Sequence, residues 1–176
     1  MNIQYINQFM EIFKGNEKIH GRFVPGAPAK PEEKQNGKSW TAHKPLSLQD
    51  YQEHITGQSS IGLNPIFDEK FVVFAVIDVD KYKEGANKHV LNRISNYSLP
   101  LLPFRSKSGG LHLYQFFSEK TEARKAIDLL KDYRQVLALD DKTEIFPKQA
   151  HLKGGKKGNW INLPYFGGDR SSRHLI

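Results

Sequence analysis

The sequence predicts an α+β fold (an α/β protein in the broad sense): a mixed, largely antiparallel sheet flanked by helices, in a single domain over residues 1–176. Three observations predict it. Segments with helical periodicity alternate with segments rich in β-branched residues, so helices and strands are interleaved. Phe71 to Val79 is apolar almost throughout, as in a strand buried on both faces. Two further strand-like segments flank a short Gly-containing turn, which indicates a hairpin.

The first helix is predicted by apolar residues at helical spacing and is ended by Gly15. These apolar residues are Ile3, Ile6, Met10 and Phe13. Residues 23–44 are rich in Pro, Gly and Lys, which predicts an irregular exposed loop able to close over a ligand. Ser47 can cap a short helix that runs to about His54.

Phe71 to Val79 is then expected to be the central strand of the sheet. The elements expected after it are a helix over residues 87–97, hairpin strands over 99–104 and 111–117, a helix from Ser118 or Thr121 to about Leu139, and short strands over 143–146 and 160–166. The long helix has a packed stripe, formed by Ala123, Ile127, Leu130 and Leu137. The last two strands flank a Gly/Lys loop at 154–158.

Composition excludes several classes of protein. The chain contains no cysteine, so disulfide bonds, thiol catalysis and cysteine-based zinc or iron–sulfur sites are excluded. No apolar run approaches the roughly 20 residues that span a bilayer, and the first residues lack the pattern of a secretory signal. We therefore expect a cytoplasmic protein without membrane contact. The formal net charge of +7 favours a polyanionic partner such as nucleic acid, although many basic domains are merely soluble.

Two aspartates, Asp78 and Asp80, stand at the end of the central strand. Side chains two apart on a strand share a face, so both carboxylates are aimed at one point beyond the last apolar residue. Burying carboxylates without a partner is costly, and hard divalent cations such as Mg²⁺ prefer oxygen ligands of this kind. The pair therefore favours a metal site. The competing interpretation is a polar strand end, with one aspartate capping a turn and the other paired to Lys81 or Lys83.

The turn of the predicted hairpin, residues 105–110, combines small residues with hydroxyl groups and cations. Its backbone N–H groups, together with Arg105, Lys107 and Ser108, can hold phosphate oxygens through charge-assisted hydrogen bonds. His112 follows two residues into the next strand. A plain Gly-Gly hairpin turn and a hydrogen-bonded core histidine explain the same residues without a ligand, so the turn alone does not establish a site.

A third acidic residue, Glu144, lies in a short apolar segment. By alternation Glu144 and Phe146 share a face, and the carboxylate reaches the aspartate pair if this strand and the central strand are neighbours. A solvent-exposed carboxylate fits the segment equally well. Glu144 is therefore a candidate third metal ligand whose position depends on the pairing of the strands.

In this order the three segments resemble the three motifs of archaeo-eukaryotic primases. The first motif is Asp-x-Asp at a strand end, matched by residues 78–80; the second is Ser-x-His or an expanded form, matched by 108–112. The third is an acidic residue beside apolar ones on a later strand, matched by Glu144. The phrase GNWINLPYFGG at 158–168 adds to the likeness. The resemblance covers roughly residues 36–168 and extends to primase–polymerase domains of phage and mobile-element replication proteins and of TOTE conflict systems.

The resemblance implies a primase catalytic core with a subdomain like the RNA-recognition motif. It also implies template-directed nucleotidyl transfer from ribo- or deoxyribonucleoside triphosphates, as DNA primase or DNA polymerase, with two divalent ions, Mg²⁺ or Mn²⁺. Asp78, Asp80 and Glu144 would be the catalytic metal ligands, and Ser108 and His112 would bind the triphosphate. Further candidates are Arg105, Lys107 and Lys148 for phosphate contacts, and Asn162 and Tyr165 for sugar or template contacts.

The partners implied are a single-stranded DNA template, a primer and nucleoside triphosphates. Many primases of this superfamily carry a cysteine-based zinc module, which the chain lacks, so we expect no zinc. The chain also lacks the Gly-x-x-x-x-Gly-Lys-[Ser/Thr] motif of an ATP-driven helicase motor. We therefore expect it to be the N-terminal part of a longer replication protein, with a helicase domain or subunit as a further partner.

Two alternatives remain open. A non-catalytic nucleic-acid-binding module of the RNA-recognition type would account for the glycine and aromatic residues of 107–114, but it leaves the converging carboxylates unexplained. A metal-dependent nuclease would use similar ligands, and only the triphosphate motif and the family likeness count against it. A replication-initiator endonuclease is disfavoured, because its pair of histidines separated by one apolar residue is absent.

Overall fold

The computed structural model describes residues 3–27, 33, 35–81, 85–152 and 158–176. It confirms the α+β class: the described residues form four α-helices, a 3₁₀ helix (η1, Gly168–Arg170) and two four-stranded sheets. Every strand pairing among them is antiparallel. None of the helices in this part of the chain is long and apolar enough to cross a membrane.

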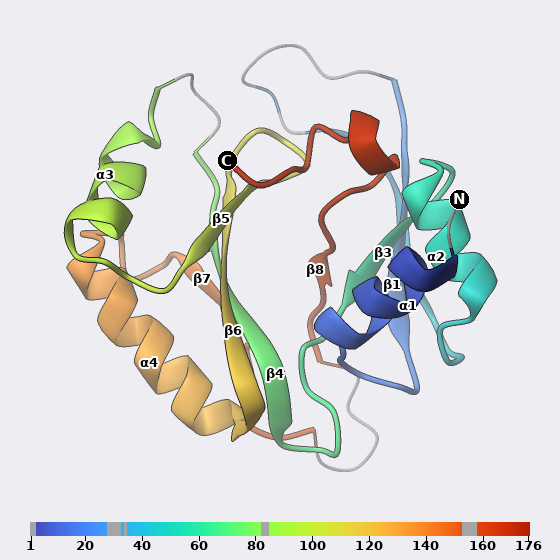
Figure 1. The fold of residues 1–176 in the computed structure, drawn as a ribbon, viewed down its shortest axis with the longest axis horizontal. Coiled ribbons are helices and arrows are strands. Elements are labelled where there is room, and N and C mark those ends of the chain that lie inside the picture. The colour runs from blue at the N-terminus through green and yellow to red at the C-terminus, as the bar shows by residue number, and fades with distance from the viewer. Residues whose placement is uncertain (1–2, 28–32, 34, 82–84, 153–157) are drawn as a thin grey trace.

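The first sheet has the strand order β2-β1-β3-β8. Its strands are β1 (His20–Pro25), β2 (Gly37–Ala42), β3 (Ser60–Leu63) and β8 (Ile161–Asn162). Helices α1 (Ile3–Ile12) and α2 (Leu48–Ile55) lie beside it, at the right of Figure 1. Arg22 and Ile61 are register partners, so they share a face, and Arg22 bonds to α2. The opposite face of β1 and β3 therefore points away from α2, with Phe23 and Ser60 on it.

The second sheet has the order β5-β6-β4-β7. Its strands are β4 (Phe71–Val79), β5 (Leu102–Arg105), β6 (Leu111–Glu122) and β7 (Glu144–Phe146). Helices α3 (Lys88–Asn96) and α4 (Ala123–Val136) cover its outer face (Figure 1). In chain order this half is β4-α3-β5-β6-α4-β7, the βαββαβ arrangement of ferredoxin-like and RNA-recognition domains. The expected subdomain is thus present.

Alternation along β4 divides the hydrophobic core in two. Ala75, Ile77 and Val79 pack against α3 and α4, whereas Phe74 and Val76 face the first sheet and α1. Asp78 continues the second set, because it follows Val76 by two residues. The strand therefore delivers Asp78 to the space between the two sheets rather than to the helical layer.

Residues 23–44, expected to form an irregular loop, contain most of a β-hairpin instead. β1 and β2 pair from His20↔Ala42 to Pro25↔Gly37, and the loop is confined to the residues between them, of which 28–32 and 34 lie outside the described residues. The prediction was wrong because β2 is an exposed edge strand whose polar side chains resemble those of a loop.

Other boundaries also differ from the sequence predictions. β3 was not expected as a strand, and the first hairpin strand is Leu102–Arg105. Ser118 and Thr121 do not start α4, because pairing with β4 extends β6 to Glu122. Only Ile161–Asn162 of the expected strand 160–166 is a strand. The predicted Gly/Lys loop lies almost wholly outside the described residues, as does Lys83.

The remaining elements agree with the predictions. Ser47 caps α2 in a capping box, with its hydroxyl accepting from the backbone N–H of Asp50 at 3.3 Å. The helix over residues 87–97 and the hairpin across the 105–110 turn are present. The expected stripe on α4 is buried; it consists of Ala123, Ile127, Leu130 and Leu137.

Arg22 is buried and forms an ion cluster beneath α2. Its guanidinium donates to Asp50 Oδ1 at 2.7 Å, to a Glu53 carboxylate oxygen, and to Ser59 Oγ at 2.9 Å. Burial would raise the pKa of Asp50, but hydrogen bonds from Ser47 and the charge of Arg22 lower it below its ordinary value. Asp50 therefore remains ionised at neutral pH, and the cluster links β1 to α2.

His54 connects α2 to two other segments. Its Nδ1 accepts the Ile61 N–H at 3.0 Å, and its Nε2 donates to the Pro164 carbonyl at 2.7 Å, a tautomer assigned from the partners. The ring is fully buried, and burial lowers its pKa to about 4. His54 is therefore neutral at physiological pH and holds the Pro164 segment against α2.

We expect acid to destabilise the protein partly through His54. The pKa of His54 is 6.5 in the unfolded chain and about 4 in the folded protein. The neutral ring therefore contributes fully to the free energy of unfolding above pH 6.5, and this contribution is lost as pH falls toward 4. It amounts to about 3 kcal/mol. Urea denaturation between these pH values should show a shallower loss of stability in His54→Gln than in the wild type. His89→Gln, at an exposed position on α3, is the control; equal slopes in wild type and His54→Gln would contradict the assignment.

Candidate active site

One row of residues crosses the second sheet from edge to edge. Asp78 on β4 pairs with His112 on β6 and, on its other side, with Glu144 on β7; Phe104 on β5 pairs with His112. Directly opposed residues of antiparallel strands project to the same face, with neighbouring Cα atoms about 4.5–5.5 Å apart. The pairing of β4 with β7 thus brings Glu144 beside Asp78, although more than 60 residues separate them in the chain. From the sequence alone, the role of Glu144 depended on this pairing.

Asp78 and His112 are in contact. Nε2 of His112 lies 3.4 Å from Asp78 Oδ1, and both side chains are largely buried. Burial, followed by the positive charges of Arg173 and Lys107, lowers the pKa of His112 to about 3. Although a carboxylate stands beside it, the imidazole is therefore neutral at pH 7, and the contact is between a neutral ring and a carboxylate rather than an ion pair.

The other two acidic residues are more exposed. Asp80 follows the last residue of β4, and Glu144 forms an ion pair with Lys148, whose ammonium also lies 5.1 Å from the Phe146 ring centroid. Within the described ranges, no three His, Asp or Glu side chains are close enough to form a ready metal site. The donors nevertheless suit a hard cation, since carboxylate oxygens of Asp78 and Glu144 come from directly opposed positions on one face.

The 105–110 turn of the second sheet reaches the first sheet. Lys107 Nζ lies 4.0 Å from the ring centroid of Phe23 on β1, and Ser108 Oγ accepts the backbone N–H of Gln35 at 3.1 Å. Within the turn, Gly109 donates its N–H to Ser106 O at 3.1 Å. Lys107 and Ser108 therefore line the junction of the two sheets, a few residues from the row that contains Asp78 and His112.

Asn162 and Tyr165 lie on the segment between the sheets. Asn162 pairs with Gly62 of β3; its Oδ1 is buried and has no hydrogen-bond partner among the described residues. Tyr165 has a positive φ of 57°, unusual for an aromatic residue, and its ring meets Phe104 edge-on at 5.8 Å. Tyr165 thus touches the residue that ends the row across the sheet.

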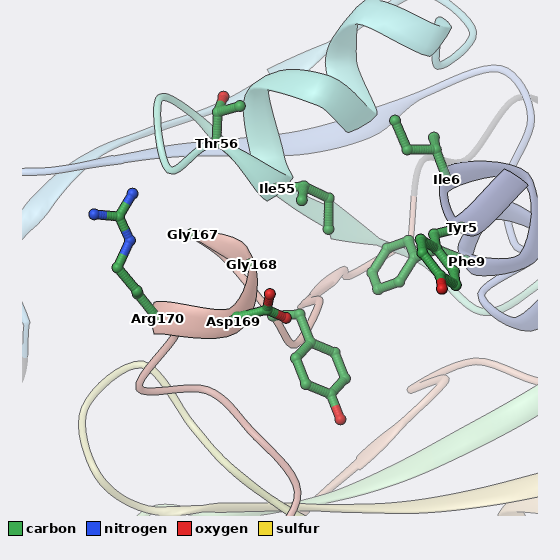
Figure 2. A pocket seen from close by; sticks show the side chains of 10 residues that line it. Tyr5, Ile6, Phe9, Ile55, Thr56, Gly167, Gly168, Asp169 and Arg170 are labelled. Atoms are coloured by element: carbon green, nitrogen blue, oxygen red, sulfur yellow. The ribbon is translucent and has the colours of Figure 1, made fainter. Parts of the chain in front are cut away.

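Tyr165 also lines a cavity of about 790 Å³ on the side of the first sheet. Figure 2 shows the pocket between α1, the end of α2 and the Gly167–Arg170 turn, with Tyr5, Phe9 and Ile55 forming an apolar wall. The cavity is separate from Asp78 and Glu144, which do not line it. The two regions are connected through Tyr165 and Phe104.

Arg173 is the residue at this junction that the sequence did not reveal. It is only 4% exposed, donates from Nη1 to Ser60 Oγ at 2.7 Å, and its guanidinium carbon lies 4.8 Å from the Phe166 ring centroid. No local pattern marks it, because its burial arises from segments that meet only in the folded chain.

The family model described as "TOTE conflict system, Archaeo-Eukaryotic Primase domain" matches residues 19–175. No curated protein matches the chain. The match spans both sheets and every residue of the row.

Proposed function

Because the chain belongs to the archaeo-eukaryotic primase domain family of TOTE conflict systems, we propose that it is a template-directed nucleotidyltransferase, acting as DNA primase, DNA polymerase or both. Membership of this family implies a nucleotidyltransferase-type role on nucleic acid. The finer proposal is that the chain takes nucleotides from nucleoside triphosphates and joins them along a single-stranded DNA template, with a primer and a helicase domain or subunit as further partners.

The observation that supports this proposal best is the register of the row. Asp78 lies between His112 and Glu144 on one face, so acidic residues and the triphosphate motif converge although they come from three strands. A module that only binds nucleic acid has no use for carboxylates beside a phosphate site, because they repel phosphate unless cations intervene.

In the proposed site Asp78, Asp80 and Glu144 hold two divalent ions, Mg²⁺ or Mn²⁺. These ions would supply activation of the attacking 3′-hydroxyl and charge stabilisation at the transferring phosphate. Glu144 would exchange Lys148 for a metal, which leaves the ammonium of Lys148 available to phosphate. No cysteine-based zinc site is proposed, because the chain contains no cysteine.

Arg105, Lys107, Ser108 and His112 are proposed to bind the triphosphate. Ser108 would exchange the Gln35 N–H, and Lys107 the ring of Phe23, for phosphate oxygens. His112 is neutral, so it positions groups by hydrogen bonding instead of transferring a proton at pH 7. Its Nε2 already faces Asp78, which lets one ring orient both the carboxylate and the nucleotide.

Asn162 and Tyr165 are proposed to contact the sugar or the template. Tyr165 joins the row to the aromatic pocket of Figure 2, where an unpaired base would stack against aromatic rings. The buried Oδ1 of Asn162 is an acceptor suited to a sugar hydroxyl or a base N–H.

The test is extension of a labelled primer on a single-stranded template, with Mg²⁺ or Mn²⁺ and ribo- or deoxyribonucleotides supplied separately. We expect template-dependent lengthening that requires the divalent ion. Shortening of the primer would indicate a nuclease. Template binding without any change of length, in extension and in primer-free assays alike, would indicate a binding module and contradict the proposal.

A further inference from the structure

Two arginines among the described residues are buried, Arg22 and Arg173. Arg22 shows how the fold neutralises a buried guanidinium, with Asp50 and Glu53 as carboxylate partners and Ser59 as a third acceptor. Arg173 has only the Ser60 hydroxyl as a side-chain hydrogen-bond partner. No described Asp or Glu forms an ion pair with it. A buried cation without an anionic partner is costly, so its position requires an explanation.

The backbone holds Arg173 in place independently of its side chain. Its carbonyl accepts the N–H of Tyr165 at 2.8 Å, and its own N–H donates to Ser171 Oγ at 3.0 Å. The next residues run along the edge strand β5, where Arg105 donates its N–H to His174 O at 3.0 Å. Figure 1 shows this last segment crossing between the two sheets. The guanidinium is therefore fixed at the junction.

The groups around Arg173 belong to the proposed triphosphate site. The residues that follow it reach the row across the second sheet, because His174 O accepts the N–H of Arg105 and Leu175 forms a β-bridge with Phe104, the register partner of His112. Ser60, its hydrogen-bond partner, shares a face of the first sheet with Phe23, which contacts Lys107. The cation thus lies at the same junction as the turn 105–110.

We propose that Arg173 is an anion subsite that binds a phosphate group of the incoming nucleoside triphosphate, together with Lys107 and Ser108. The inference rests on the proposed function for the identity of the anion. A guanidinium offers five N–H donors in a fork that matches phosphate oxygens, and the Ser60 hydroxyl uses one of them. The triphosphate would then supply the negative charge that Asp50 and Glu53 supply to Arg22.

The test compares Arg173→Met with Arg124→Met, which removes the same charge from an exposed position on α4, the helix that covers the opposite face of the second sheet. Binding of inorganic tripolyphosphate and of a nucleoside triphosphate, each with Mg²⁺ and without template, is measured by calorimetry. We expect Arg173→Met to weaken both about 10- to 100-fold and Arg124→Met to leave both unchanged. Urea denaturation without ligand should give Arg173→Met a midpoint equal to or above that of the wild type, because the replaced charge has no carboxylate partner.

The outcomes separate this inference from the proposed function. Wild-type binding of tripolyphosphate that depends on Arg173, without any primer extension, would support the subsite and contradict the polymerase. Equal affinities of wild type and Arg173→Met would overturn the subsite, as would equal weakening by Arg124→Met. If Arg173→Met does not fold, Arg173→Lys is used instead, because lysine keeps the positive charge but lacks the forked N–H donors of a guanidinium. Unchanged affinity of that variant for tripolyphosphate and for the nucleoside triphosphate would also overturn the proposal.

Discussion

Asp78→Asn is expected to reduce template-directed primer extension about 1000-fold or more while the protein stays folded. Asparagine has the same shape but lacks the charge that a divalent ion requires, and loss of several kcal/mol of transition-state stabilisation corresponds to a decrease of this size. The fold should tolerate the change, because Asp78 is only 14% exposed in its side chain and a neutral amide costs less to bury than a carboxylate. Single-turnover extension rates and urea denaturation measure the two effects.

Asp132→Asn provides the matched control, since Asp132 is exposed on α4, which covers the opposite face of the second sheet. It should retain the wild-type rate. Asp80→Asn should resemble Asp78→Asn in activity if both aspartates hold metal. Extension by Asp78→Asn at a rate within tenfold of the wild type would remove Asp78 from the catalytic site.

Arg22→Ala is expected to lower the free energy of unfolding by about 3–5 kcal/mol, the largest stability effect among these predictions. The substitution leaves Asp50, 5% exposed, and Glu53 close together beneath α2 without the guanidinium that binds both. Lys44 lies 3.5 Å from Asp50 but is mostly exposed, so it compensates little. Equilibrium denaturation in urea at neutral pH measures the loss.

Lys131→Ala is the comparison for a solvent-exposed pair. Lys131 lies 3.0 Å from Asp128, and both side chains are about half exposed. Its removal should cost less than about 1 kcal/mol. If Arg22→Ala costs no more than Lys131→Ala, the buried cluster does not stabilise the contact between β1 and α2.

Much of the second half of the chain was predictable because its signals are local. The apolar run of β4 and the Gly-containing turn of the β5–β6 hairpin depend on neighbours within a few residues. The strands of the first sheet were harder to predict from the sequence. β2 is a polar edge strand and β3 has four residues, so neither carries a periodic pattern long enough to identify it.

The candidate site likewise has residues that local spacing identifies and contacts that only the folded chain creates. Asp78, Asp80 and the Ser108 to His112 motif were recognisable from spacing and from the family resemblance. The contact between Asp78 and His112 and the pairing of Asp78 with Glu144 depend on the register of β4 with β6 and β7, which one sequence does not specify. Lys148 as the partner of Glu144 is likewise a property of the folded chain.

The sequence by itself determined the fold class, the family motifs and the candidate site residues, because these depend on residue type and short spacing. Only the tertiary structure decided that the strands form two sheets, that Asp78, His112 and Glu144 share one face, and that Arg173 is buried without a carboxylate partner among the described residues. The physical reason is that register and burial arise from contacts between segments far apart in the chain, and the energetic cost of a buried charge exists only after those segments meet.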